Sequence, residues 1–353
     1  MYKAFIARCK FVEPVFLKHI QFLRNSLLEL CSLDVQKSSS KALLSIQQLA
    51  KILQQGLRTK NKEALTKICS WQYTWCIDLW VMFISANIRD FDLQPLLFMI
   101  IQVINGVAHL FSGPRYLPLR RKCIQWLNHL SSSSGIFIPV ASLVLDALEY
   151  KIGKDGGKSG KPFDLSSVIK LPKHWLKSRS FQEECIFSAI ELLSAHFALW
   201  SYHISFPDLA TIPLIRLRKF YEATTIESLR RVVKRLIDQM EQNIEFIQKK
   251  RDEVAFSPHN QESVESFLQL EKSSSNAPFT QYYKSVIEKA ASRNLFMNEK
   301  ISLLEQKKLK KRKQQLLNQV DMSANGELDS EKGKVNPSVN GGEDGNLRKK
   351  KRT

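Results

Sequence analysis

Glycine and proline are scarce in this sequence of 353 residues, which contains 13 and 12 of them, respectively. Sheet proteins need many turn residues, and glycine weakens the interior of a helix, so the scarcity favours helices. Alternating apolar and polar residues bounded by hairpin turns are also missing. The hydrophobic fraction of 44% is typical of a globular protein, and the chain is long enough to bury a core.

Recognisable catalytic and metal-binding motifs are absent as well. None of the six cysteines belongs to a CxxC pair, and most lie in apolar stretches, as small core residues in a reducing compartment do. The seven histidines are scattered, and neither HExxH nor GxSxG occurs. The loop at residues 153–161 lacks the spacing of a phosphate-binding loop. We therefore expect a non-enzymatic protein without metal or cofactor.

The N-terminus shows no secretory signal, and one stretch raises the question of a membrane span. Residues 93–114 carry no formal charge and are rich in Leu, Ile, Phe and Val. They also include Gln94, Pro95, Gln102 and Asn105, which are unfavourable in hydrocarbon. We expect a helix buried among other helices and no membrane contact.

Acidic residues are fewer than basic residues in this sequence. The 53 Lys and Arg residues against 34 Asp and Glu residues give a net charge of +19. Residues 300–353 hold 14 basic and 7 acidic side chains, which leaves 39 basic and 27 acidic residues in the first 299. The excess therefore belongs to the folded part as well as to the tail. It predicts attraction to polyanions such as nucleic acid.

Helical patterns follow one another over the first 270 residues. One helix is expected from Lys41, with N-cap candidates at residues 38–40. A helix over residues 64–88 would place Trp71, Trp75, Leu79 and Phe83 on one face. Further helices are expected at residues 93–111, 120–130, 140–150, 181–200, after Pro213, and at 225–251.

These patterns predict an all-α fold, an irregular HEAT- or armadillo-like helical repeat array with a basic, partly disordered C-terminal tail. A compact helical bundle is the alternative. We expect the array to cover residues 1–270 and a linker with a short aromatic and helical segment to cover 271–298. A basic helix at 299–320 and a disordered basic tail at 321–353 would follow.

Two groups of basic residues within the array are candidates for contact with RNA or a partner. The first follows Gly113, where two prolines predict an extended crossing; it comprises Arg115, Tyr116, Arg120, Arg121 and Lys122. In the alternative interpretation Tyr116 packs and only some of these cations are free. The second group lies on the amphipathic helix at 225–251: Arg230, Arg231, Lys234 and Arg235. Residues 206–208 look like a helix-entry turn with Asp208 as the cap.

The tail contains two dense basic runs that suit the acidic grooves of nuclear import receptors and also RNA phosphates. The first comprises Lys307, Lys308, Lys310, Lys311, Arg312 and Lys313, and the second comprises Arg348, Lys349, Lys350, Lys351 and Arg352. They predict location in the nucleus and nucleolus, as well as binding to import receptors.

Several short motifs, in this order, resemble the nucleolar complex protein 2 family over roughly residues 1–285. They are Leu49-Ala50, residues 70–73 (SWQY), Leu79-Trp80, residues 93–96 (LQPL), 102–106 (QVING), 115–120 (RYLPLR), 137–139 (FIP), 204–208 (ISFPD) and 241–243 (EQN), continuing to Arg251. Members of that family have a long charged N-terminal portion and further helices before this region. On this resemblance we expect the chain to begin inside the fold.

The resemblance implies a helical scaffold without catalysis that pairs with nucleolar complex proteins 1 and 3. It also implies association with precursor particles of the large (60S) ribosomal subunit and their precursor rRNA. Two other functions are compatible with a basic helical array: a chromatin or transcription cofactor, and a nuclear transport adaptor. The second is disfavoured because importin-like arrays usually carry acidic inner surfaces.

Overall fold

The computed structural model describes residues 1–10, 16–150, 165–257, 259–274 and 277–296, together with the single residues 299, 303 and 306. The chain divides into two compact units, residues 1–298 and 299–353. Both basic runs of the tail and the loop at 153–161 lie outside the described residues.

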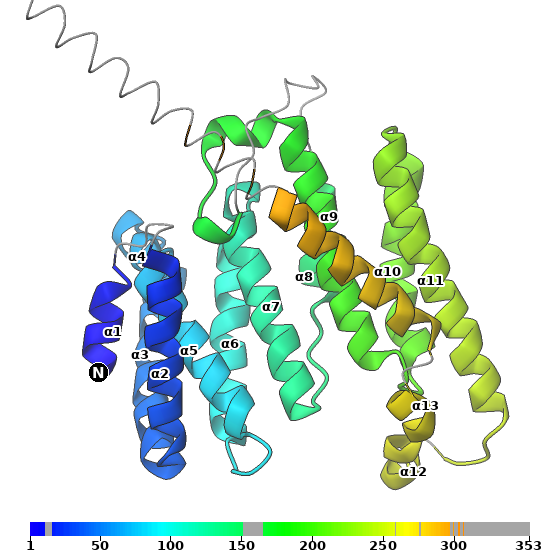
Figure 1. Cartoon of the computed structure of the whole chain (residues 1–353), viewed down its shortest axis with the longest axis horizontal. Coiled ribbons are helices and arrows are strands. Elements are labelled where there is room, and N and C mark those ends of the chain that lie inside the picture. The colour runs from blue at the N-terminus through cyan, green and yellow to red at the C-terminus, as the bar shows by residue number, and fades with distance from the viewer. Residues whose placement is uncertain are drawn as a thin grey trace, which may run out of the picture. The chain divides into compact units, whose positions relative to one another are not determined.

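The described part of the first unit is all-α, as predicted, and contains no strand. Its helices pack side by side in chain order: α3 on α6, α6 on α7, α7 on α9, and α11 on both α9 and α10 (Figure 1). That this array is of the HEAT or armadillo type stays a prediction. The α-helices are α1 (Tyr2–Arg8), α2 (Leu17–Ser32), α3 (Val35–Thr59), α4 (Lys62–Ile68), α5 (Trp71–Asn87), α6 (Gln94–Leu110), α7 (Leu117–Ser134), α8 (Ala141–Leu145), α9 (Arg179–Trp200), α10 (Phe206–Ala223), α11 (Glu227–Asp252), α12 (Gln261–Ser266) and α13 (Gln269–Ser274).

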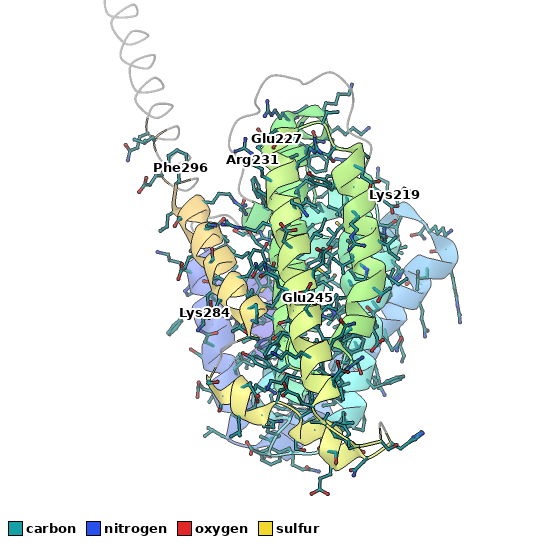
Figure 2. The ribbon with its side chains drawn as sticks, turned by 90° about the vertical axis from the view of Figure 1, so that its right-hand side faces the viewer. Lys219, Glu227, Arg231, Glu245, Lys284 and Phe296 are labelled. Carbon is teal, nitrogen blue, oxygen red and sulfur yellow. The ribbon has the colours of Figure 1, made fainter. Side chains whose placement is uncertain are left out.

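Four short 3-10 helices and one last helix complete the described part. The 3-10 helices are η2 (Pro114–Tyr116), η3 (Asp146–Glu149), η4 (Leu165–Ser167) and η5 (Lys173–Lys177). The last helix covers residues 278–296 and lies beside α11, as the view onto α10 and α11 shows (Figure 2). Phe279 of this helix is fully buried against Phe197 and Phe206. The aromatic patch that the sequence placed in a linker is therefore part of the core.

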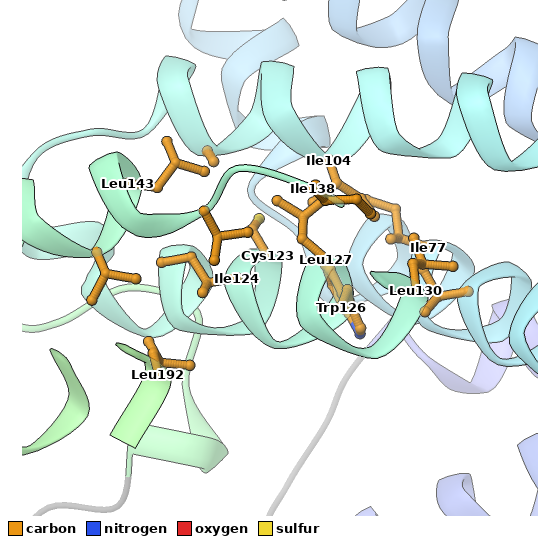
Figure 3. Close-up of a cluster of buried hydrophobic side chains, with 14 of the residues drawn as sticks. Ile77, Ile104, Cys123, Ile124, Trp126, Leu127, Leu130, Ile138, Leu143 and Leu192 are labelled. Atoms are coloured by element: carbon orange, nitrogen blue, oxygen red, sulfur yellow. The ribbon is translucent and has the colours of Figure 1, made fainter. Parts of the chain in front are cut away.

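Helix α7 lies at the centre of the core, where its apolar residues are covered from opposite sides (Figure 3). Leu127 and Leu130 are completely buried, and so are Ile77 of α5 and Ile104 of α6. Leu192 of α9 closes the other side of α7. The uncharged stretch at 93–114 contributes α6, and none of the described helices combines the length and the hydropathy needed to cross a membrane.

Several boundaries differ from those predicted. Helix α3 begins at Val35 because the Asp34 carboxylate accepts a hydrogen bond of 2.9 Å from the backbone N–H of Lys37, so residues 38–40 are inside the helix. The helix predicted over 64–88 is two helices, because the backbone turns at Cys69 and Ser70 caps α5 through the N–H of Tyr73.

Helix α10 shows that packing can override a local signal. It begins at Phe206 and contains Pro213 in its interior, whereas the sequence predicted a start after that proline. Proline removes one backbone hydrogen bond. Burial of Phe206, Ala210 and Leu214 in the core offsets that loss. Asp208 lies in the first turn and is not the cap; instead its carboxylate accepts a hydrogen bond of 2.7 Å from Arg251 of α11.

Candidate functional site

The first predicted group of basic residues follows the turn between α6 and α7. This turn is helical, because Pro114 begins η2 and Pro118 lies in the first turn of α7, so the predicted extended crossing is wrong. The Tyr116 ring packs against Phe111 with their centroids 4.8 Å apart, and the Lys170 ammonium lies 5.0 Å from its centroid. Tyr116 therefore packs, as the alternative interpretation expected, and its ring already has a cation beside it.

Arg120 is not a surface residue. Only 3% of it is exposed, and its guanidinium donates hydrogen bonds to the Ser112 carbonyl at 3.2 Å and to Asp146 at 2.6 Å. Arg216 of α10 donates to the other carboxylate oxygen of Asp146 at 3.1 Å. Arg120 thus joins α7, η3 and, through Asp146, α10, and the prediction of a phosphate contact is wrong for this residue.

The other three cations of this group also have partners within the fold. Arg115 donates to the Leu171 carbonyl at 3.1 Å, and Lys122 lies 5.7 Å from the centroid of the Trp71 ring. Arg121 donates to Glu191 of α9 at 3.1 Å. The five residues therefore do not assemble into one phosphate-binding surface, because their charged groups are directed to separate internal partners.

The second predicted group does come together, on the exposed face of α11. Arg230, Arg231, Lys234 and Arg235 line one depression of about 340 Å³, which Tyr221 of α10 borders. Side-chain exposure in this group reaches 75% at Arg231. Leu229, Val233 and Leu236 of the apolar stripe of α11 are completely buried and hold this face outward.

Ion pairs within α11 neutralise part of this positive face. Lys234 donates to Asp238 at 2.7 Å, and this hydrogen bond raises the pKa of the ammonium group. Arg230 and Arg231 lie 3.9 Å and 3.4 Å from Glu227. Exposed pairs at this spacing contribute little to stability, so a phosphate can replace the carboxylate at small cost. Four cations against two carboxylates leave the depression positive. We name the four residues Arg230, Arg231, Lys234 and Arg235 the α11 basic face.

A groove of about 540 Å³ adjoins the α11 basic face, and the sequence did not predict it. It lies between α9, α11 and the helix at 278–296 (Figure 2). Its apolar lining comprises Phe187, Ile190, Val232, Tyr282, Val286 and Ala290. Arg231, Arg235, Lys289 and Arg293 surround this lining, and Glu191 also contributes to it. We call this site the α9–α11 groove.

Glu191 holds the third wall of the α9–α11 groove in place. Its carboxylate accepts hydrogen bonds from Arg121 of α7 and from Arg293 of the helix at 278–296. The Arg293 guanidinium also lies over the Phe187 ring, 4.6 Å from its centroid. Glu184 of α9 is half-buried nearby, and desolvation raises the pKa of its carboxyl group. The helix at 278–296, which the sequence predicted as a short helical segment of a linker, is therefore anchored by charge as well as by Phe279.

The sequence does contain a signal for this wall. Tyr282, Val286, Ala290 and Arg293 recur at three- and four-residue steps, which is the spacing of one helix face. Sequence spacing does not show that this helix packs against α9 and α11. The groove between the three helices therefore could not be predicted from the sequence. Among the residues that the structure describes, no group of three or more His, Cys, Asp or Glu side chains is arranged to hold a metal ion.

Comparison with known proteins identifies the family of this chain. The profile of the Noc2p family matches residues 1–286. The chain is 63% identical to the protein REBELOTE of Arabidopsis thaliana over 294 residues, which are 83% of this chain and 49% of that protein. It is 40% identical to nucleolar complex-associated protein 2 of the same plant over 296 residues, 83% of this chain and 39% of the relative. The chain belongs to the Noc2p family.

The Noc2p family relationship extends beyond plants. Nucleolar complex protein 2 of Drosophila melanogaster is 28% identical over 292 residues, which are 81% of this chain and 38% of the fly protein. The chain thus spans about half the length, or less, of these curated relatives. The family match includes all of α9 and α11 but ends within the helix at 278–296, before Lys289 and Arg293. Two cations of the α9–α11 groove therefore lie outside the matched region.

Proposed function

We propose that this Noc2p-family chain is a non-enzymatic nucleolar scaffold in assembly of the large (60S) ribosomal subunit. It is a nucleolar protein, as the names of its relatives indicate, and its role in ribosome biogenesis is part of this proposal. Its partners are nucleolar complex proteins 1 and 3, which follow from the family resemblance, and the precursor rRNA of pre-60S particles. The basic runs at 307–313 and 348–352 serve as signals for import receptors.

The observation that supports RNA binding is the α11 basic face. Its four cations are gathered on one helix, where Arg231, Lys234 and Arg235 are exposed and Arg230 lies over the Tyr221 ring. Pairs with Glu227 and Asp238 are the only ion pairs of this face in the described part of the chain. Its dense positive charge suits phosphate groups, which carry no sequence information. Binding should therefore depend strongly on salt and weakly on sequence.

Crosslinking and sequencing of the tagged chain tests this function. Precursor rRNA of the large subunit should dominate the crosslinked RNA, and a second nucleolar complex protein should copurify. Recovery of the chain free of pre-ribosomal particles would contradict the proposal. Dominant contacts with histones or DNA would instead favour a chromatin or transcription cofactor.

A triple variant tests the α11 basic face. Arg231→Gln, Lys234→Gln and Arg235→Gln together should reduce the slope of log affinity for single-stranded RNA against log salt by about two, because each lost phosphate contact removes roughly 0.7. The matched control makes the same charge change on α3, with Lys41→Gln, Lys51→Gln and Arg58→Gln at exposed positions. Equal slopes in the two triple variants would remove the α11 basic face from the proposal.

A further inference from the structure

The α9–α11 groove has an apolar floor that the fold leaves uncovered. Its accessible part is formed by the half-buried Val232 of α11 and by Val286 and Ala290 of the helix at 278–296, and the buried Ile190 of α9 also lines it. Its volume of about 540 Å³ is within the range of sites that bind ligands in folded proteins. Side chains of a partner that reached this floor would gain free energy by leaving water.

The mostly positive side chains around the floor favour a partner that carries carboxylate groups. Arg231, Arg235, Lys289 and Arg293 line the groove together with one acid, Glu191. Glu191 is already engaged by Arg121 and Arg293. Among the residues that the structure describes, neither Arg235 nor Lys289 forms an ion pair, and both side chains are exposed. A partner that brought acidic side chains to these two positions would complete the charge pattern.

The aromatic residues of the groove argue for a protein rather than a nucleic acid. Base stacking needs an open aromatic face. The Phe187 ring has the Arg293 guanidinium over it at 4.6 Å. Tyr282 is 8% exposed, and its ring packs edge-on against Phe279 at 5.6 Å. The floor that remains is aliphatic, which suits the side chains of Leu, Ile, Val or Met.

We propose that the α9–α11 groove docks an acidic amphipathic helix of a partner protein. Its apolar side chains would lie on the floor formed by Val232, Val286 and Ala290, and its Asp or Glu side chains would meet Arg235 and Lys289. This arrangement follows the general mode in which an amphipathic helix lies in a hydrophobic groove. It names the chemistry of a partner of the scaffold proposed above, and it does not require the contacts between the α11 basic face and RNA.

The test begins with a displayed library of helical 16-residue peptides selected on the full chain. Peptides with apolar residues at three- and four-residue steps and with Asp or Glu beside them should be enriched. The affinity of an enriched, fluorescein-labelled peptide is then measured by anisotropy. The charge-reversed variant Arg235→Glu/Lys289→Glu should bind it at least tenfold more weakly, and the same peptide with Lys in place of its acids should bind that variant more tightly than the original chain.

Two control variants separate docking from simple charge attraction. Lys219→Glu/Lys284→Glu makes the same charge change at exposed positions outside the groove, on α10 and on the helix at 278–296 (Figure 2), and should keep the affinity within about threefold. Ala290→Gln changes no charge but extends a polar side chain over the floor, and it should also weaken binding at least tenfold. Thermal unfolding followed by circular dichroism should give each variant the same Tm as the original chain, which shows that the variants fold.

Three results would overturn the proposal. The selection could enrich no acidic amphipathic pattern, or the groove variants and the control variant could bind the peptide with equal affinity. A scrambled peptide of the same composition could also bind as tightly as the selected one. Loss of single-stranded RNA binding in Ala290→Gln, with peptide binding unchanged, would assign the groove to nucleic acid instead. The proposed RNA contact is tested separately by Lys234→Gln, because Lys234 does not line the groove.

Discussion

Arg120 and Asp146 form an ion pair of 2.6 Å in which the two partners differ greatly in exposure. The arginine side chain is 3% exposed and the aspartate side chain is 46% exposed. Burial alone would raise the pKa of Asp146, but hydrogen bonds from Arg120 and Arg216 outweigh this effect and lower it. The two partners therefore depend on the pair unequally, because only the arginine side chain is removed from water and needs its partner to offset the lost hydration.

This asymmetry predicts that Asp146→Ala destabilises the chain more than Arg120→Met. Loss of Asp146 leaves a buried guanidinium without a counterion, at a cost of about 3–5 kcal/mol. Loss of Arg120 leaves Asp146 with Arg216 and with water, at a cost of about 1–3 kcal/mol. Urea unfolding of both variants measures the two free energies, and the reverse order would contradict the structural role assigned to the pair.

Leu127→Ala should lower the free energy of unfolding by about 2–5 kcal/mol, because the completely buried side chain leaves a cavity at the centre of the core. Leu44→Ala on α3 is the matched control, since its leucine is 68% exposed, and its effect should stay within about 0.5 kcal/mol. The midpoints of urea unfolding, at unchanged slope, measure both. Similar effects at the two positions would mean that α7 is not enclosed as described.

His196 should make the fold sensitive to acid. Burial lowers the pKa of His196 to about 4, whereas an unfolded histidine titrates near 6.5. Protons therefore bind the unfolded chain first, so the stability contributed by neutral His196 is complete above pH 6.5 and is lost as the pH falls toward 4. His196→Leu should reduce the loss of unfolding free energy between pH 7 and pH 5 by about 2 kcal/mol.

Urea unfolding at several pH values measures this slope, and His259→Leu at an exposed histidine is the matched control. Desolvation also lowers the pKa values of His129 and of the half-buried His203, so these residues keep part of the acid sensitivity in the variant. An unchanged slope in His196→Leu would show that this histidine is accessible to protons in the folded state.

Glu191→Gln should loosen the helix at 278–296. The carboxylate holds Arg121 and Arg293 together, and hydrogen bonds to charged groups are worth about 1.5–3 kcal/mol. Amide hydrogen exchange in residues 278–296 should become at least tenfold faster. Glu183→Gln is the control, since it removes an exposed pair with Arg179 on the same helix and should leave exchange in 278–296 unchanged.

Local patterns were sufficient to predict the all-α fold and the outward direction of Arg231 and Lys234. The apolar stripe of α11 has a helical period, and this period determines which residues can face solvent. Helix limits were less predictable. Asp34 caps α3 through one hydrogen bond. Pro213 lies inside α10 because its neighbours are buried. Neither effect follows from composition.

The first candidate group shows where sequence reasoning stops. Arg120 and Arg121 are basic residues after a turn, which is also what an RNA-binding loop contains. Their partners Asp146 and Glu191 lie 26 and 70 positions away in the chain. Pairing over such separations depends on the way in which helices stack, so the sequence alone does not distinguish a buried structural arginine from an exposed one.

Phe279 has a consequence for the order of events during synthesis. Its ring packs against both Phe197 and Phe206, yet it is made more than seventy residues after either of them. The aromatic centre of this end of the array must therefore wait, partly open to water, until the last described helix emerges from the ribosome. A nascent chain halted after α11 would expose these rings to chaperones, and they would be covered only after Phe279 had left the ribosome.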